Sequence, residues 1–109
     1  MLHPSQMLKI RHADAAAVFP LGGKATLASV TVSAVDGAWG TAVLTPKWAN
    51  AQGGPWFTFA AGELSDATMG PGDDSTAWIN VQGKGFLAVV VTTAEGAEDF
   101  VTVAVCDDA

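Results

Sequence analysis

The clearest pattern of apolar and polar positions lies near the end of the chain, where two runs rich in β-branched residues flank a polar linker. The runs cover residues 86–93 and 99–105, and the five-residue linker 94–98 contains a glycine. Such a pattern predicts a β-hairpin. In a symmetric register, one face of this hairpin carries three apolar pairs: Leu87 with Val105, Val89 with Val103, and Val91 with Val101. We expect that face to be part of a core.

The opposite face of the same hairpin is also largely apolar. Its residues are Phe86, Ala88, Val90, Thr92, Phe100, Thr102, Ala104 and Cys106. A face of this composition is too apolar to lie open to water in a simple two-layer protein. A further layer or a partner is therefore expected to cover it.

Two earlier segments alternate in a similar way. Residues 24–35 alternate apolar and hydroxyl side chains, which is typical of a strand with one wet face. An Asp-Gly turn signal at 36–37 precedes a second alternating strand at 40–48. The two strands are predicted to form a hairpin over 24–48. Pro46 has no N–H to donate to a neighbouring strand, so its part of the second strand is expected at an edge or a bulge.

The middle of the chain predicts shorter elements. Residues 49–55 have the composition of a loop, and 56–59 are a short aromatic strand whose rings need burial. Residues 60–75 are rich in glycine, proline and acidic side chains, which predicts a long surface excursion with a brief extended piece at 63–67. Residues 76–82 alternate again and predict a strand that leads into the closing hairpin. This reading gives six or seven strands.

Residues 1–23 differ from the rest of the chain. Their apolar residues are irregularly spaced, Pro4 and Pro20 interrupt them, and a pair of glycines ends the segment. We expect an N-terminal arm outside the core, which uses its basic residues to reach an acidic patch on a neighbour. The remaining residues, 24–109, are expected to form one β-sandwich domain.

Composition supports an all-β class and limits the partners. Twelve valines and ten threonines with few Glu, Lys or Arg favour short strands over helices. A net charge of −6 argues against binding to nucleic acid, and no apolar run reaches the roughly 20 residues of a membrane span. The single cysteine, Cys106, cannot form an intrachain disulfide. Because only 15% of the residues are charged, self-association is expected to cover apolar surface.

The residue types and their positions give little support for catalysis. A nucleophile needs a neighbouring base, and the two histidines, His3 and His12, both lie in the predicted arm. Cys106 ends a predicted core strand, where a free cysteine usually packs as a small apolar residue. We therefore expect no enzyme activity, no catalytic residues and no cofactor.

Two binding sites can be weighed against simpler explanations. Asp66, Asp73 and Asp74 could share a calcium ion, but their spacing does not match an EF-hand loop, and a solvated acidic loop is favoured. The four tryptophans could form a sugar-stacking platform, for which Trp39 is expected to be the most exposed. The other three, Trp48, Trp56 and Trp78, fall in predicted strands and are expected in a core or an interface.

Several segments together resemble a class of small virion proteins of tailed bacteriophages. They are ATLASVTVSAV at 25–35, GTAVL at 40–44, the Gly-Gly-Pro-Trp turn at 53–56, and GFLAVVV at 85–91 with TAEGAE and FVTVAV after it. The resemblance covers residues 24–105 and extends to a short N-terminal segment before them. It departs at Ala88, where the family often has a basic residue.

The resemblance implies a non-enzymatic β-sandwich, of jelly-roll or immunoglobulin-like form, that assembles on a phage particle after synthesis in the host cytoplasm. It favours a capsid decoration (cement) protein that binds the major capsid protein as a homo-oligomer, expected to be a trimer, with a head–tail or tail component as the alternative. A carbohydrate-binding module is the alternative of another class. The residues expected at interfaces are Leu8, Ile10, Arg11, Phe19, Trp39, Phe86, Val90 and Phe100.

Overall fold

The structure, a computed structural model, describes residues 1–35, 39–70, 74–94 and 100–109. Its elements are β1 (Gln6–Lys9), β2 (Ala16–Pro20), β3 (Leu27–Ala34), β4 (Val43–Ala49), β5 (Phe57–Thr58), the 3₁₀ helix η1 (Ala61–Glu63), β6 (Ser75–Asn80), β7 (Phe86–Thr93) and β8 (Phe100–Asp107). The expected all-β class is confirmed.

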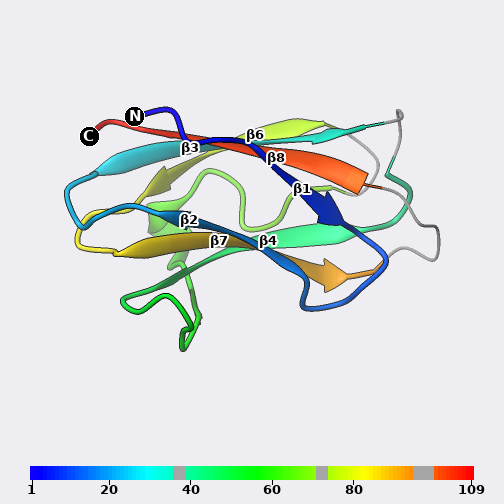
Figure 1. Cartoon of the computed structure of the whole chain (residues 1–109), viewed down its shortest axis with the longest axis horizontal. Helices are drawn as coiled ribbons and strands as arrows, with labels where there is room; N and C mark the ends of the chain where they lie inside the picture. The colour runs from blue at the N-terminus through cyan, green and yellow to red at the C-terminus, as the bar shows by residue number, and fades with distance from the viewer. Residues whose placement is uncertain (36–38, 71–73, 95–99) are drawn as a thin grey trace.

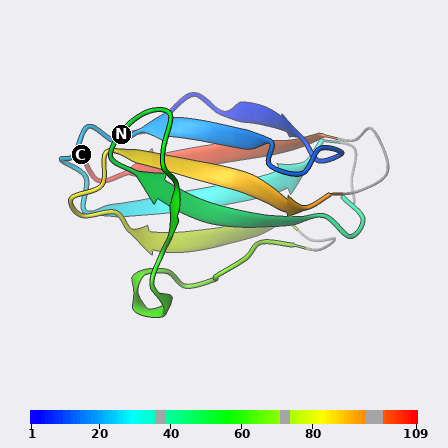
Figure 2. The ribbon, with the colours of Figure 1, turned by 90° about the horizontal axis from the view of Figure 1, so that it is seen from below.

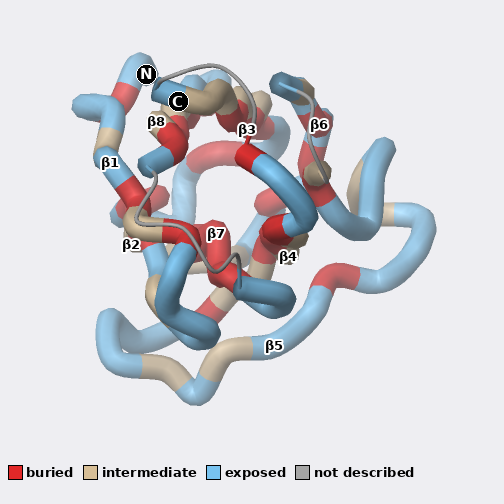
Figure 3. Tube along the Cα trace, turned by 90° about the vertical axis from the view of Figure 1, so that its right-hand side faces the viewer, coloured by how far each residue is buried: buried red, intermediate tan, exposed pale blue. Residues whose placement is uncertain are grey.

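The strands form two antiparallel sheets that pack face to face (Figure 1). Sheet A has the order β1-β8-β3-β6, and sheet B has the order β2-β7-β4-β5. Buried residues gather between the two layers, and exposed residues lie on their outer faces and in the loops (Figure 3). The expected antiparallel β-sandwich is therefore confirmed.

The strand pairing follows one rule. β1 pairs with β8, β2 with β7, β3 with β6, and β4 with β5, all antiparallel. The chain is thus one long hairpin, turned between β4 and β5 and rolled so that successive pairs fall alternately in sheet A and sheet B. Eight strands in two sheets with this order are a jelly roll, whereas an immunoglobulin-like domain keeps its first two strands in one sheet.

The two hairpins predicted from the sequence are wrong. β7 belongs to sheet B and β8 to sheet A, and likewise β3 and β4 lie in opposite sheets. Alternation determines which side of a strand is buried, but two strands facing each other across a core produce the same alternation as two strands paired in one sheet. The predicted connections at 36–37 and 94–98 lie outside the described residues, apart from Ala94.

Although their pairing was wrong, the predicted inward faces are confirmed. Val89 and Val103 are both fully buried in one core, but they approach it from opposite sheets. The alternation of 24–35 and 76–82 is also confirmed, since the buried side chains of β3 and β6 are Ala28, Val30, Val32, Ala77 and Ile79.

The N-terminal segment corrects the expectation of an arm outside the core. β1 pairs with β8, and β2 pairs with β7. Ile10 and Phe19 are among the most deeply buried side chains, and Gln6 Nε2 donates a hydrogen bond to the carbonyl of Val18 at 2.7 Å. The segment thus supplies one edge strand to each sheet and closes that side of the sandwich. Its strands are only four and five residues long, too short to display a clear alternation.

Residues between β5 and β6 follow the outside of the sandwich as expected, with two attachments. Met69 is buried and exchanges backbone hydrogen bonds of 2.8 and 2.9 Å with Leu44. Leu64 bridges Ile79 at the edge of β6. The backbone N–H of Leu44 donates to Met69 and therefore points away from β7. The nitrogen of Pro46, two residues further along, points to the same side of β4. It lies between Met69 and β5, where no strand requires a donor, so the missing N–H of Pro46 is tolerated.

Candidate interaction surface

Most of the residues expected at interfaces are buried within this chain. The core contains Leu8, Ile10, Phe19 and Trp39, and Val90 is only 7% exposed. Arg11 is exposed, Phe86 is half-buried, and Phe100 is 37% exposed. The expectation fails for Leu8, Ile10 and Phe19 because it treated the N-terminal segment as an arm, and for Trp39 because it placed this residue in an exposed turn. Val90 is buried on the central strand β7, between β2 and β4.

The outer face of sheet A presents several large, exposed apolar side chains. We define the sheet-A outer face as Leu2, Met7, Lys9, Leu27, Ser29, Thr31, Ser33, Thr76, Trp78, Asn80, Phe100, Thr102, Ala104 and Cys106. Of these side chains, Lys9 alone is charged, and it lies beside Phe100. Leu2 is 75% exposed, Met7 62% and Trp78 56%, and these large side chains lie on the edges of the sheet.

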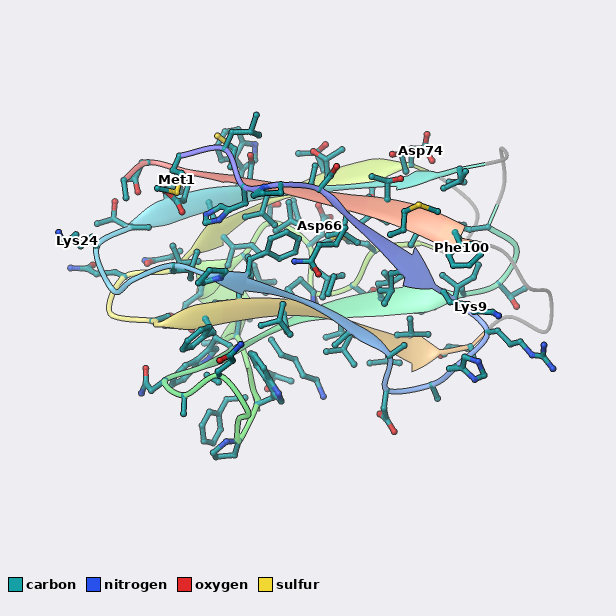
Figure 4. All side chains as sticks on the ribbon, in the orientation of Figure 1. Met1, Lys9, Lys24, Asp66, Asp74 and Phe100 are labelled. Carbon is teal, nitrogen blue, oxygen red and sulfur yellow. The ribbon has the colours of Figure 1, made fainter. Side chains whose placement is uncertain are left out.

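The centre of the sheet-A outer face is made of small side chains. They come from the two central strands, β8 and β3, and some of their polar groups form hydrogen bonds within the sheet. Thr31 and Thr76 share a hydroxyl hydrogen bond of 3.0 Å, and Ser29 Oγ lies 3.5 Å from the carbonyl of Cys106. Phe100 and Lys9 lie together at the far end from Met1, where Lys9 Nζ is 5.8 Å from the ring centroid (Figure 4).

Sequence reasoning found only part of this surface. The predicted alternation of 76–82 did place Trp78 on the polar side of its strand, which was the available signal for an exposed tryptophan. Leu2 and Met7 were missed because they fall in the segment treated as an arm. Cys106 is exposed, since it points away from the core, opposite to its neighbours Val105 and Asp107.

The outer face of sheet B is better covered by its own chain (Figure 2). Ala88 and Val90 point outward from the central strand β7 but are buried, because β2 and β4 flank them on both sides. Thr45 and Thr92 share a hydroxyl hydrogen bond of 3.0 Å on this face. The second face of the predicted closing hairpin, which was expected to need a cover, is therefore divided between the outer faces of the two sheets. Its residues in β7, on sheet B, are largely buried by this chain itself.

A second group of aromatic side chains lies near the turn between β4 and β5, and its contacts are made within this chain. Trp48 and Phe57 have ring centroids 5.0 Å apart, and Lys84 Nζ lies 4.8 Å from the Trp48 ring. Lys84 also forms a 3.0 Å ion pair with Glu63, whose pKa is lowered by the backbone N–H of Ala60 and by Lys84. These contacts attach η1 to the β6–β7 connection. Lys84 therefore lies over the Trp48 ring and, at 5.6 Å, over the Phe59 ring.

The expected sugar-stacking platform does not assemble around Trp39. Its ring is 1% exposed and belongs to the core, so the expectation that it would be the most exposed tryptophan is wrong. Trp78 lies on the sheet-A outer face, while Trp48 lies on sheet B. The tryptophan side chains are distributed over different parts of the fold.

His3 makes a buried contact with Asp107. His3 Nε2 lies 2.6 Å from Asp107 Oδ2, and both side chains are almost fully buried. Burial raises the pKa of Asp107, but hydrogen bonds from His3, from the backbone of Ala109 and from the amino group of Met1 lower it by more. Cys106, the next residue along β8, points to the opposite face. His3 and Cys106 therefore form no pair, and His3 fastens the first residues to β8.

Asp108 fastens the end of β8 to the start of β3. Its carboxylate accepts hydrogen bonds from the hydroxyl and the backbone N–H of Thr26 and from the N–H of Leu27, the last two at 2.7 and 3.1 Å. The Thr26 hydroxyl, followed by these backbone groups, lowers the pKa of Asp108 from 3.8 to about 2.

We expect acid to weaken this attachment. Because the folded pKa of Asp108 lies below the ordinary value, its contribution to stability is complete above the unfolded pKa of 3.8 and is lost as the pH falls toward about 2. Thermal melts between pH 5 and pH 2 should show a shallower loss of melting temperature for Asp108→Asn than for the unchanged chain. Asp66→Asn, a change away from β3, is the control. Equal slopes for the unchanged chain and the Asp108 variant would contradict the assignment.

Of the three aspartates considered for calcium, two are described. Asp74 Oδ1 accepts the backbone N–H of Ala34 at 2.9 Å, and Asp66 accepts the Ser65 hydroxyl at 3.3 Å. Asp73 lies outside the described residues. Within the described ranges, no group of three His, Cys, Asp or Glu side chains is close enough to hold a metal ion. The same part of the chain has no detected pocket and no helix long and apolar enough to cross a membrane.

Comparison of the sequence with known protein families and with characterised proteins finds no match. Comparison of the fold with solved structures finds a similar chain in the SPBc2 prophage-derived protein YomS. The two chains superpose with a TM-score of 0.62 at 8% sequence identity, over 99% of this chain and 96% of YomS. At that identity the likeness establishes the fold, which the two proteins share over nearly their whole lengths.

Proposed function

We propose that this chain is a non-enzymatic structural protein of a bacteriophage particle, and that it decorates the outside of the assembled capsid. The observation that carries the proposal is the mostly uncharged sheet-A outer face, on which Leu2, Met7 and Trp78 are each more than half exposed. Exposed apolar side chains that gather on one face mark a protein–protein interaction site. Such a face suits a protein whose activity is assembly.

The fold is compatible with this role. Jelly rolls occur in viral capsid domains and also in lectins, so the topology alone does not decide between assembly and sugar binding. The similar fold of a prophage-derived protein and the sequence resemblance to virion proteins both favour the particle. The partners in this proposal are further copies of the chain and the major capsid protein.

Removal of the protein from particles tests the proposal. Particles made without this chain should assemble but release their DNA at a lower temperature, because a decoration protein adds contacts between neighbouring capsomers. Purified chain added to these particles should bind them and restore the original release temperature. Particles that neither contain nor bind the chain would contradict the proposal. Binding restricted to the neck or tail would instead assign the chain to the head–tail or tail component.

A further inference from the structure

We propose that residues 1–21 exchange between neighbouring copies of this chain. In the exchanged pair, β1 and β2 of each copy lie against β8 and β7 of the other copy. The surface involved is thus the edge of β8 together with the edge of β7, and the partner is this chain itself. The inference rests on the proposed function, because it specifies how copies are joined on a particle.

Residues 1–21 form one unit on one side of the sandwich (Figure 3). β1 is an edge strand of sheet A and pairs with β8, while β2 is an edge strand of sheet B and pairs with β7. The side chain of Gln6 links the two strands through its hydrogen bond to the carbonyl of Val18. Because every copy has the same β7 and β8, a second copy can accept this unit.

The attachments of residues 1–21 to the rest of the chain are also present on a second copy. His3 binds Asp107 on β8, and the N–H of Leu21 donates a 2.8 Å hydrogen bond to the carbonyl of Gly85, just before β7. Phe19 is buried in the core between the two sheets. An exchanged pair therefore regains the contacts that it breaks, and this is why domain swapping is a low-cost route to dimers.

The turn that joins residues 1–21 to β3 has the properties of a hinge. Residues 22–24 form an exposed turn, in which Gly22 and Gly23 have φ values of +70° and +75°. This left-handed region is open to glycine but unfavourable for other residues. A Cβ at either glycine would meet nothing within 4 Å, so no neighbouring side chain packs against this side of the turn. Extension of the two glycines releases residues 1–21 without loss of such contacts.

Concentration decides which copy holds the unit. Leu8, Ile10 and Phe19 belong to the core, so a chain whose residues 1–21 are detached is unstable until a unit binds again. The contacts are the same in both arrangements, and a short flexible connection gives a chain's own unit an effective concentration in the millimolar range. We therefore expect a closed monomer at micromolar concentration and exchange where copies lie side by side, as on a shell.

Leu2→Cys provides a reporter of exchange, because residue 2 forms a bridge with Cys106. Residues directly opposite one another in an antiparallel pair have Cα atoms about 4.5–5.5 Å apart, a distance that a disulfide spans. Leu2 is 75% exposed and Cys106 is exposed, so the bond forms at the surface. In a closed monomer the disulfide lies within one chain, whereas in an exchanged pair it joins two chains. Peptide mapping by mass spectrometry identifies the linked residues.

The Leu2→Cys chain is refolded and oxidised at two concentrations. At about 10 μM the disulfide should lie within one chain, and at about 1 mM a large share should link residue 2 of one chain to Cys106 of another. Gly22→Val in the same background should raise the dimerisation constant by roughly thirtyfold or more, because valine strains the folded-back turn in both copies. Linked dimers should then appear at micromolar concentration.

Gly83→Val in the same background is the matched control. Gly83 has a φ of +74°, and a Cβ there would also meet nothing within 4 Å. It lies in the connection between β6 and β7, and exchange about this point would have to remove β7 and β8, which each have strands on both sides. The control should remain a closed monomer at about 10 μM. Circular dichroism melts establish that each variant is folded.

The outcomes separate this inference from the proposed function. Disulfides within one chain only, at about 1 mM with the unchanged hinge, would overturn the exchange even if the Gly22 variant failed to fold. Dimers linked only from Cys106 to Cys106, or equal dimerisation of the Gly22 and Gly83 variants, would also overturn it. Binding of the chain to undecorated particles would uphold the proposed function in each case. Exchange without binding to particles would uphold the inference and refute the decoration role.

Discussion

A chain shortened to begin at Lys24 is expected not to fold. The truncation removes β1 and β2, one edge strand from each sheet. It also removes four large buried apolar side chains from the core, Leu8, Ile10, Phe19 and Leu21, together with Ala17. Each such side chain contributes roughly 1.5–3 kcal/mol through burial, so the loss is comparable with the whole stability of a small domain, about 5–15 kcal/mol.

Circular dichroism and thermal melting of the shortened chain beside the full chain provide the measurement. A cooperative melt of the shortened chain would show that residues 1–23 are dispensable and would contradict the structure. A milder variant addresses the same point in a folded chain. Phe19→Ala should lower the free energy of unfolding by about 3–5 kcal/mol, whereas Phe57→Ala, at a ring that is 48% exposed, should cost much less.

Gly70→Ala is expected to be the most damaging single-methyl change. Gly70 has a φ of +91°, and a Cβ at this position would lie 2.6 Å from the carbonyl oxygen of Ala42 and 3.1 Å from Cζ2 of Trp39. The left-handed backbone costs an alanine about 1–2 kcal/mol, and overpacking against a backbone atom and a buried ring adds about 1–3 kcal/mol. Denaturant unfolding should therefore show a loss of roughly 2–5 kcal/mol.

Gly83→Ala separates the two contributions. Gly83 has a φ of +74°, and a Cβ there would meet nothing within 4 Å. This control should show only the cost of the left-handed backbone. Equal losses in the two variants would mean that the Ala42 carbonyl and the Trp39 ring relax away from the added methyl group.

The sequence pattern predicted strands and buried faces well where the strands are long. Residues 24–35 and 76–82 became β3 and β6 with the expected inward side chains, because the two-residue repeat of a strand is fixed by its backbone geometry. The alternation did not show which strands pair with one another in a sheet. Val89 and Val103 belong to one core in either arrangement, and only the connection between their strands decides whether they share a sheet.

The candidate surface was harder to predict than the core. Leu2 and Met7 lie on an outer face because the first residues are bound along β8, and that attachment includes the distant contact of His3 with Asp107. Trp39 shows the reverse error. It follows a turn signal and was expected to be exposed, but its ring lies in the core beside Gly70. Long-range contacts of this kind leave no periodic trace in the sequence.

Electron cryomicroscopy of particles from the host that carries the gene of this chain tests the proposal that the chain coats a phage capsid. We expect density on the outer surface of the shell into which the jelly roll fits, with copies repeated according to the shell symmetry. Particles in which the chain is absent by mass spectrometry, with a bare shell in the density, would contradict the claim.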